Sequence, residues 1–175
     1  MTVFAHNGYS ETKMSDVAAA AQVSYGLAYH YFANKEAIFN ALIQKALRGA
    51  LNLMQYARAQ PGTPPDRLCW LTSEMLRGAQ DESEYETLIL RALTSSAVSE
   101  DARKLVLDEG RSVHEALKLL IIDGQTSGEV VGDDPDLLAT AFEWCIQGMV
   151  FGMSYQGDES ARLPGVETVL RMLKA

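Results

Sequence analysis

The chain has 175 residues, of which 47% are hydrophobic and 22% are charged, and its net charge is −8. This length suits one domain, or a small domain joined to a larger one, and the composition is that of an ordinary globular protein with a sizeable core. No apolar run approaches the roughly eighteen residues that a bilayer-crossing helix needs, and the first residues do not have the pattern of a secretory signal. We therefore expect a cytoplasmic protein with no membrane partner.

The acidic charge is unevenly distributed along the chain. Residues 1–48 contain four basic and three acidic side chains, whereas the rest of the chain contains eleven basic and twenty acidic ones. A polyanion would therefore meet the N-terminal quarter and be repelled by the remainder. Cys69 and Cys145 are isolated in apolar surroundings, so we interpret them as two buried, reduced thiols rather than as a disulfide.

Glycine and proline residues divide the chain into segments with helical periodicity. A short helix is predicted from about residue 14 to residue 21. Ser24 is expected to cap a second helix at 25–32, and Asn34 to cap a long third one that ends before the breaker at 61–65. Further helices are predicted at 66–79, at 82–96, at 99–128, at 132–157 with Asp134 as its N-cap, and from about Pro164 onward. No segment alternates like a strand, so the predicted fold class is all-α, with eight or nine helices.

Residues 25–32 contain four aromatic side chains and one histidine. On a helical wheel, Ala28 and Phe32 share the face that would pack on the preceding helix, whereas Gly26 and His30 point the opposite way. Gly26 is a poor helix former, and it suits a face that approaches another molecule closely, such as the floor of a major groove. Two short helices joined by a tight turn, the second rich in side chains able to contact bases and phosphates, describe a helix-turn-helix.

A set of residues with fixed spacing extends this pattern over Gly8–Ile43: Gly8-Tyr9, Thr12, Asp16-Val17-Ala18, Val23-Ser24, Gly26, Tyr29, Phe32 and Lys35-Glu36. On these residues the segment resembles the DNA-binding motif of the TetR family of bacterial transcriptional repressors. The resemblance implies that four residues lie where the family reads bases: Tyr25, Gly26, Leu27 and His30. It also implies that five lie where the family holds phosphates: Lys13, Ser15, Tyr29, Tyr31 and Lys35.

Three details qualify this correspondence. Ser24 begins a helix, where free backbone N–H groups also suit a phosphate, so we include it among the DNA contacts. Lys13 departs from the small hydroxyl residue common at its position. Only residues 2–7 and the initial methionine precede Gly8, so we expect a short or truncated first helix, with Phe4 as its sole large core residue.

The resemblance also implies a domain organisation: a DNA-binding domain at 1–34, a connecting helix at 35–60, and an effector-binding and dimerisation domain at 61–175. The predicted function is that of a ligand-responsive regulator, a repressor that binds a palindromic DNA operator as a homodimer and is released by a small effector. The alternative is a helical small-molecule-binding or interaction protein that has lost DNA binding through its truncated first helix.

The segment 137–156 is apolar on nearly every side, and such a helix must be covered all round. We expect it to form a homodimer interface together with the last helix, and a central core helix of a monomer is the alternative. The interface would comprise Trp144, Gly148, Phe151, Gly152, Tyr155, Val169, Leu170 and Leu173.

Methionine and aromatic side chains could line an effector pocket, although each one by itself is more typical of ordinary core. The candidates are Trp70, Met75, Tyr85, Leu90, His114, Phe142 and Met149. His114 either orients a polar ligand group or is a plain surface histidine.

The acidic run at 81–86 is interpreted as the solvated first turn of a helix rather than as a metal site. The three histidines are scattered, and the chain has no metal, phosphate-loop or nucleophile motif. We therefore expect no enzyme, no metal and no cofactor.

Overall fold

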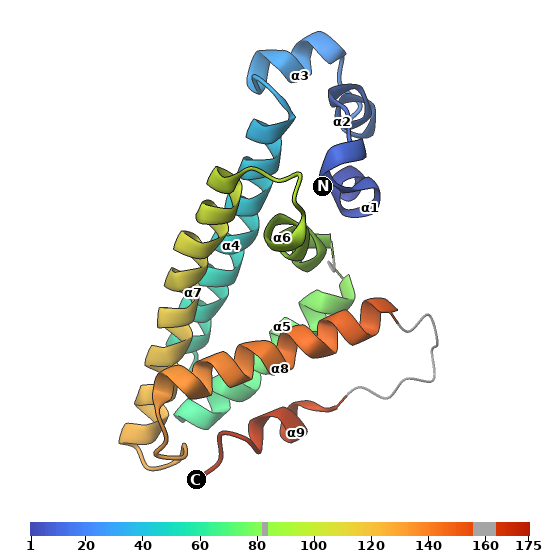
Figure 1. The fold of residues 1–175 in the computed structure, drawn as a ribbon. Helices are drawn as coiled ribbons and strands as arrows, with labels where there is room; N and C mark the ends of the chain where they lie inside the picture. The colour runs from blue at the N-terminus through green and yellow to red at the C-terminus, as the bar shows by residue number, and fades with distance from the viewer. Residues whose placement is uncertain (82–83, 156–163) are drawn as a thin grey trace. The chain divides into compact units, whose positions relative to one another are not determined.

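The computed structural model describes residues 1–81, 84–155 and 164–175, which form nine α-helices and no strand (Figure 1). Within these residues an isolated antiparallel bridge joins Val130 and Lys174. The predicted all-α class is therefore confirmed. None of the described helices combines the length and the hydropathy needed to cross a membrane. The acidic run at 81–86 includes residues 82 and 83, which lie outside the described part of the chain.

The chain folds into two compact units. The first unit consists of Met1–Arg48 and Glu84–Gly110, and the second unit consists of Gly49–Ser83 and Arg111–Ala175. Two long helices contribute to both units: α4 (Lys35–Ala59) and α7 (Glu100–Thr126). The domain boundaries expected from the sequence follow chain order, and for that reason they do not place residues 84–110 with the N-terminal segment.

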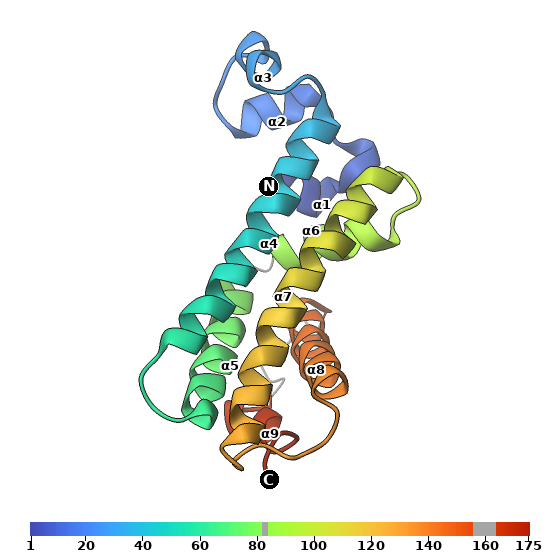
Figure 2. The ribbon, with the colours of Figure 1, turned by 90° about the vertical axis from the view of Figure 1, so that its left-hand side faces the viewer.

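The first unit contains four shorter helices besides its share of α4 and α7: α1 (Thr2–Glu11), α2 (Met14–Ala20), α3 (Tyr25–Tyr31) and α6 (Glu84–Thr94). Helix α1 packs on α2 and α6, and α2 packs on α3 (Figure 2). Their shared core includes Phe4, Met14, Ala18, Ala28, Phe39, Ile43, Leu88 and Ala102. Phe4 is almost completely buried, as predicted for the one large core residue of the first helix.

The second unit contains α5 (Pro64–Asp81), α8 (Pro135–Tyr155) and α9 (Val166–Leu170), together with the C-terminal parts of α4 and α7. Helix α5 packs against both α8 and α9 (Figure 1). The core of this unit includes Met54, Leu68, Leu71, Leu117, Ile121, Phe142, Ile146 and Val169. An ion pair between Arg58 Nε and Asp123 Oδ2, 2.9 Å apart, adds a contact between α4 and α7.

The helix starts follow side-chain caps that are visible in the sequence. The Ser24 hydroxyl accepts a hydrogen bond from the Leu27 N–H at 3.1 Å, and Asn34 Oδ1 accepts one from the Ala37 N–H at 2.9 Å. Asp134 Oδ1 accepts from the Asp136 N–H at 2.8 Å. Each such cap stabilises a helix by about 1 kcal/mol because it satisfies a backbone donor that has no partner within the helix.

In the turn between α2 and α3, one residue other than glycine has a left-handed backbone conformation. Gln22 has φ = 55°, directly after the C-cap of α2. Its N–H donates to the Ala19 carbonyl at 3.0 Å, and the Val23 N–H donates to the Ala18 carbonyl at 3.0 Å. Glycine is the usual residue at this position of a helix end, because a Cβ there costs about 1 kcal/mol.

We expect Gln22→Gly to raise the free energy of unfolding by about 0.5–1 kcal/mol, since the relief of left-handed strain outweighs the extra entropy of the unfolded chain. Urea unfolding monitored by circular dichroism would show a higher midpoint at an unchanged slope. Gln22→Ala is the matched control, because alanine keeps the Cβ and should leave the midpoint close to that of the wild type. Equal midpoints for the glycine and alanine variants would contradict the prediction.

Candidate functional site

The outward side of α3 carries large apolar side chains that the protein leaves uncovered. Tyr25, Leu27, Tyr29 and Tyr31 are between 43% and 72% exposed, and His30 between them is exposed as well. A Cβ added to Gly26 would meet no atom within 4 Å, so nothing in the chain itself explains the absence of a side chain there. Exposed apolar groups gathered on a seven-residue helix mark a contact surface.

The aromatic side chains of α3 hold one another in place. The Tyr25 and Tyr29 hydroxyls share a hydrogen bond at 3.3 Å, and their ring centroids lie 4.9 Å apart in an edge-to-face arrangement. The rings of His30 and Tyr31 make a similar contact at 5.3 Å. Side chains ordered before binding lose less conformational entropy when a partner arrives.

The residues expected to hold phosphates have different surroundings. Lys13 and Ser15 are exposed at the start of α2, where the Asp16 carboxylate accepts hydrogen bonds from the Lys13 N–H at 2.9 Å and the Ser15 hydroxyl at 3.2 Å. The Ser24 hydroxyl serves as the cap of α3. The Lys35 ammonium donates to three backbone carbonyls of the first unit.

The residues expected to line an effector pocket are divided between the two units. Tyr85 and Leu90 lie on α6 in the first unit, and Leu90 is exposed. In the second unit Phe142 and Met149 are buried core residues. Trp70 and Met75, both on α5, are partly buried and pack against the same core.

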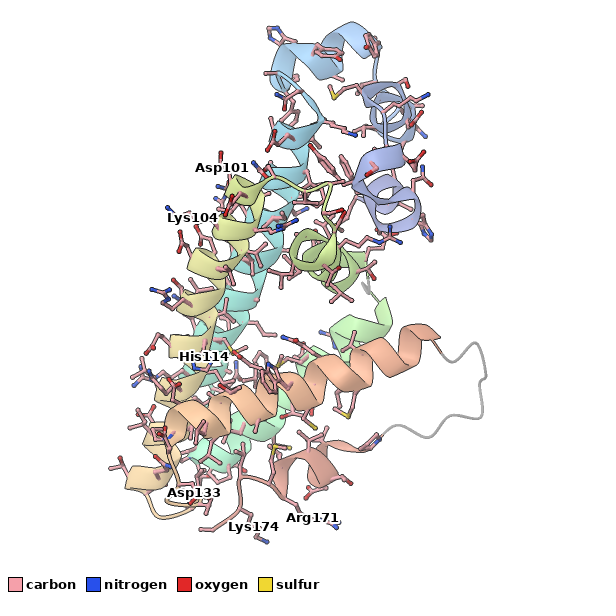
Figure 3. All side chains as sticks on the ribbon, in the orientation of Figure 1. Asp101, Lys104, His114, Asp133, Arg171 and Lys174 are labelled. Atoms are coloured by element: carbon pink, nitrogen blue, oxygen red, sulfur yellow. The ribbon has the colours of Figure 1, made fainter. Side chains whose placement is uncertain are left out.

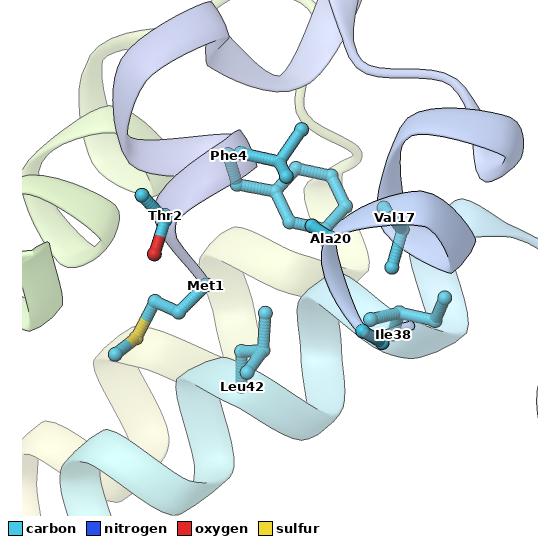
Figure 4. Close-up of a pocket in the computed structure, with 9 residues that line it drawn as sticks. Met1, Thr2, Phe4, Val17, Ala20, Ile38 and Leu42 are labelled. Atoms are coloured by element: carbon cyan, nitrogen blue, oxygen red, sulfur yellow. The ribbon is translucent and has the colours of Figure 1, made fainter. Parts of the chain in front are cut away.

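A small cavity of about 170 Å³ lies within the first unit (Figure 4). Its lining is largely apolar and comes from the chain start, α1, α2 and α4, with Met1, Phe4, Val17, Ala20, Ile38 and Leu42 among its residues. None of these was predicted as a ligand contact. The volume is below the roughly 300–1,000 Å³ of typical small-molecule sites, so this hollow is too small for most effectors.

His114 is not a plain surface histidine. It lies on α7, at the level where α8 passes (Figure 3), and its side chain is 20% exposed. Nδ1 is 3.1 Å from Glu143 Oε2 and Nε2 is 3.3 Å from Asp136 Oδ1, both on α8. A carboxylate only accepts hydrogen bonds, so both contacts are satisfied together only when the ring carries a proton on each nitrogen. The doubly protonated form of His114 therefore joins α7 to α8 through both carboxylates.

The charges around His114 account for its titration. Burial by itself lowers the pKa of His114, but the hydrogen bonds and charges of Glu143 and Asp136 outweigh it and hold the pKa above the ordinary 6.5. The same contact, together with Lys118 Nζ at 3.3 Å, lowers the pKa of Asp136. Lys118 also pairs with Glu115 on its own helix. The sequence shows only Glu115 near His114, because the two acidic partners lie 22 and 29 positions further along the chain.

Helix α8 is apolar on two sides, and its own unit covers only one of them. Ala139, Phe142, Ile146, Met149 and Val150 are buried. The opposite face, called here the open face of α8, presents Leu137, Ala141, Trp144 and Gly148 to solvent; Trp144 is 70% exposed and Leu137 67%. A Cβ added at Gly148 or Gly152 would meet no atom of the described residues within 4 Å. Phe151 and Tyr155 lie on α8, but their side chains are outside the described part of the structure.

The residues of the last helix, which are expected from the sequence to lie in a dimer interface, pack in the core of their own unit. Val169 and Leu173 are only 2% exposed and belong to the core of the second unit, and Leu170 packs against that core. The helix itself ends at Leu170, and the Val131 N–H donates to the Leu173 carbonyl at 2.9 Å. These residues cover α5 and α8 of their own chain, whereas Trp144 and Gly148 on the open face of α8 are exposed.

Comparisons with known proteins agree with the helix-turn-helix geometry. Residues 1–42 match the family model described as bacterial regulatory proteins of the tetR family. The resemblance found in the sequence is therefore confirmed for the N-terminal segment. No curated protein matches the chain significantly.

Solved structures extend the likeness to the whole fold. The fatty acid degradation regulator FadR of Bacillus halodurans aligns with a TM-score of 0.81 at 19% identity, over 98% of this chain and 91% of that one. FadR of Bacillus subtilis in complex with stearoyl-CoA aligns with a TM-score of 0.80 at 23% identity, over 99% and 93%. A putative regulator of Saccharomonospora viridis in complex with choline aligns with a TM-score of 0.77 at 20% identity, over 97% and 86%. The chain thus has the fold of TetR-family transcriptional regulators, and these neighbours are regulators rather than enzymes.

The His114 contacts predict a pH dependence of stability. Because the folded pKa is raised, protonation of His114 stabilises the fold fully below the unfolded value of 6.5, and this contribution is lost as the pH rises through the folded pKa. The stability difference between wild type and His114→Gln should therefore shrink as the pH is raised from roughly 5.5 to roughly 9. Urea unfolding across this range measures it, and His6→Gln, an exposed histidine on α1, is the control. The same pH dependence in wild type and His114→Gln would contradict the assignment.

Proposed function

We propose that this protein is a ligand-responsive transcriptional repressor that binds a palindromic operator as a homodimer. The observation that carries the proposal is the exposed, mutually ordered side-chain surface of α3 on a helix-turn-helix scaffold. In this motif the second helix enters the major groove, and phosphate contacts fix its register. Tyr25, Leu27 and His30 would contact base edges, and Gly26 would allow the helix backbone to come close to them.

Electrostatics support DNA as the partner of the N-terminal segment in particular. Residues 1–48 have a small positive balance within a chain of net charge −8. A duplex would be attracted to that segment and repelled by the acidic remainder, which restricts the orientations in which it can bind. Lys13 and the hydroxyls of Tyr29 and Tyr31 would hold phosphates.

The open face of α8 supports the homodimer. Leu137, Ala141, Trp144 and Gly148 follow one another at spacings of four, three and four residues, which is the spacing of a helix–helix seam. The glycines would allow a second helix to approach closely. Two copies related by a two-fold axis would cover this face and present two α3 helices to half-sites about 34–36 Å apart.

The second unit would carry the effector response. The B. subtilis FadR and S. viridis regulator neighbours were solved with stearoyl-CoA and with choline, which supports a small-molecule effector of some kind for this chain. The effector would favour a state in which the two α3 helices no longer match the half-sites. Selection of duplexes from a random pool at low salt tests the proposal, and enrichment of a palindrome is the expected result. No duplex binding at low salt would overturn it in favour of the alternative, a helical binding protein without DNA affinity.

Two substitutions should separate base reading from phosphate binding. We expect His30→Ala to cost about 1–3 kcal/mol on the selected duplex and little on a scrambled one, because only base contacts carry sequence information. Lys13→Ala should weaken binding to both duplexes alike and reduce the slope of log K against log salt by about 0.9 for each protomer, about 1.8 for the dimer. Fluorescence anisotropy at several salt concentrations measures both effects. Equal losses of the His30 variant on the two duplexes would exclude a base-reading role.

A substitution on the open face of α8 should separate the protomers. We expect Trp144→Arg to weaken dimerisation by about 2 kcal/mol, roughly thirty-fold in Kd, because a central exposed tryptophan is a typical interface anchor. Light scattering over a concentration series would detect the change. Tyr56→Arg is the control, since Tyr56 is 65% exposed and belongs to α4 rather than to α8. A monomeric wild type, or a Trp144→Arg variant that dimerises as tightly as wild type, would contradict this interface.

A further inference from the structure

Helix α1 ends in a way that leaves backbone carbonyls without helical partners. Gly8 has φ = 80° and ψ = 169°, which interrupts the helical backbone, and the chain then passes through Glu11 and Thr12 to the start of α2. Thr12 is 1% exposed, and its hydroxyl donates to the Gly8 carbonyl at 2.6 Å. The carbonyls that follow this break cannot be satisfied within the helix and need other donors.

Lys35 supplies those donors. Its ammonium donates to the carbonyls of Tyr9 at 2.8 Å, Ser10 at 3.1 Å and Thr12 at 3.1 Å. An ammonium has three N–H groups, so each of them is engaged by one carbonyl. The cation also lies 4.6 Å from the centroid of the Tyr9 ring, where it gains cation–π attraction. In this arrangement the lysine that the family resemblance places at a phosphate has no donor left for one.

The environment of Tyr9 makes this attachment rigid. Its ring packs edge-to-face on Phe39 of α4 at 5.0 Å and is stacked near Phe4 of α1 at 6.3 Å. Burial, followed by the charge of Glu36, raises the pKa of the Tyr9 hydroxyl, so the ring facing Lys35 remains neutral. The backbone of Gly8 has a positive φ of 80°, a conformation that favours glycine over residues with a Cβ.

The location of Lys35 gives these contacts a consequence for the recognition helix. Lys35 is the first residue of α4, shortly after the end of α3, whereas its three acceptors lie in the last turn of α1 and in the short link from α1 to α2. The ammonium therefore fixes the two ends of the α2–α3 segment to each other. We infer that Lys35 is a positioning residue, which sets the orientation of the helix-turn-helix through the α1–α2 junction and does not bind phosphate itself. This inference rests on the proposed DNA-binding function.

The dependence of DNA affinity on salt concentration distinguishes a lysine that binds phosphate from a lysine that positions the helix-turn-helix. Lys35→Met keeps the aliphatic stem and removes all three donors. On the palindromic duplex selected by the wild type we expect about a tenfold loss of affinity with an unchanged salt slope, and on a scrambled duplex a change of less than about twofold, because only the specific fit depends on the orientation of α3. Lys13→Met, at an exposed lysine of the same unit, is the matched control and should lower the slope on both duplexes by about 1.8 for the dimer. A slope lowered by about 1.8 in Lys35→Met, with equal losses on both duplexes, would overturn the inference.

Lys35→Arg gives a second, independent test. The guanidinium keeps the charge and binds phosphates at least as well as an ammonium, but its planar fork does not match three carbonyls arranged around a tetrahedral nitrogen. We expect Lys35→Arg to lose specific affinity as Lys35→Met does, whereas wild-type affinity in this variant would contradict the inference. All variants are compared at a temperature at which circular dichroism shows full helicity, and Lys35→Gln replaces Lys35→Met if the latter is not fully folded.

Hydrogen exchange keeps the inference testable apart from DNA binding. Amides of α2 and α3 should exchange faster in Lys35→Met than in wild type, and at the wild-type rate in Lys13→Met. A wild type that binds neither duplex at low salt would refute the proposed function, and the exchange rates alone would then decide whether Lys35 fixes the α2–α3 segment. Unchanged exchange in Lys35→Met would overturn that role.

Discussion

The first unit depends on a requirement that the pattern of side chains in the sequence does not show. Each backbone carbonyl that has no helical partner where α1 ends must accept a hydrogen bond from another donor. The interruption at Gly8 frees several of them beside the packed rings of Tyr9 and Phe39. A single side chain, Lys35, satisfies three of these carbonyls, because its ammonium has three N–H groups and donates one hydrogen bond to each. The orientation of α2 and α3 is then set by contacts at both ends of the α2–α3 segment, and not only by the turn between the two helices.

That arrangement changes how the positive charge of the N-terminal segment is used. Of the lysines expected at the DNA surface, Lys13 is exposed, whereas Lys35 neutralises the carbonyl end of a helix within the protein. Less charge is available for unspecific attraction, and more of the recognition would rest on the ordered aromatic side chains of α3. Such a surface favours shape and base-edge contacts over long-range attraction, in a protein whose overall charge opposes DNA.

Local signals in the sequence were sufficient for the helices and insufficient for their partners. The caps Ser24, Asn34 and Asp134 act within three residues, so the sequence shows donor and acceptor together. Lys35 and its acceptors are separated by 23 to 26 positions, and His114 and its carboxylates by 22 and 29, so only the fold brings them together. The residues of α8 and α9 that face the core and those that face solvent are apolar alike. Their periodicity therefore does not distinguish Val169, which is buried, from Trp144, which is exposed.

The exposure of Trp144 follows from how α8 is held about its own axis. On one side, Phe142, Ile146 and Met149 pack into the core of the second unit. On another, Asp136 and Glu143 bind the two nitrogens of His114. Leu137 and Trp144 each directly follow one of these carboxylates in sequence, so a rotation that buried them would break the imidazolium contacts and expose the core side chains. The hydrophobic packing and the His114 charge contacts thus select the same rotation of the helix, and the open face of α8 is its consequence.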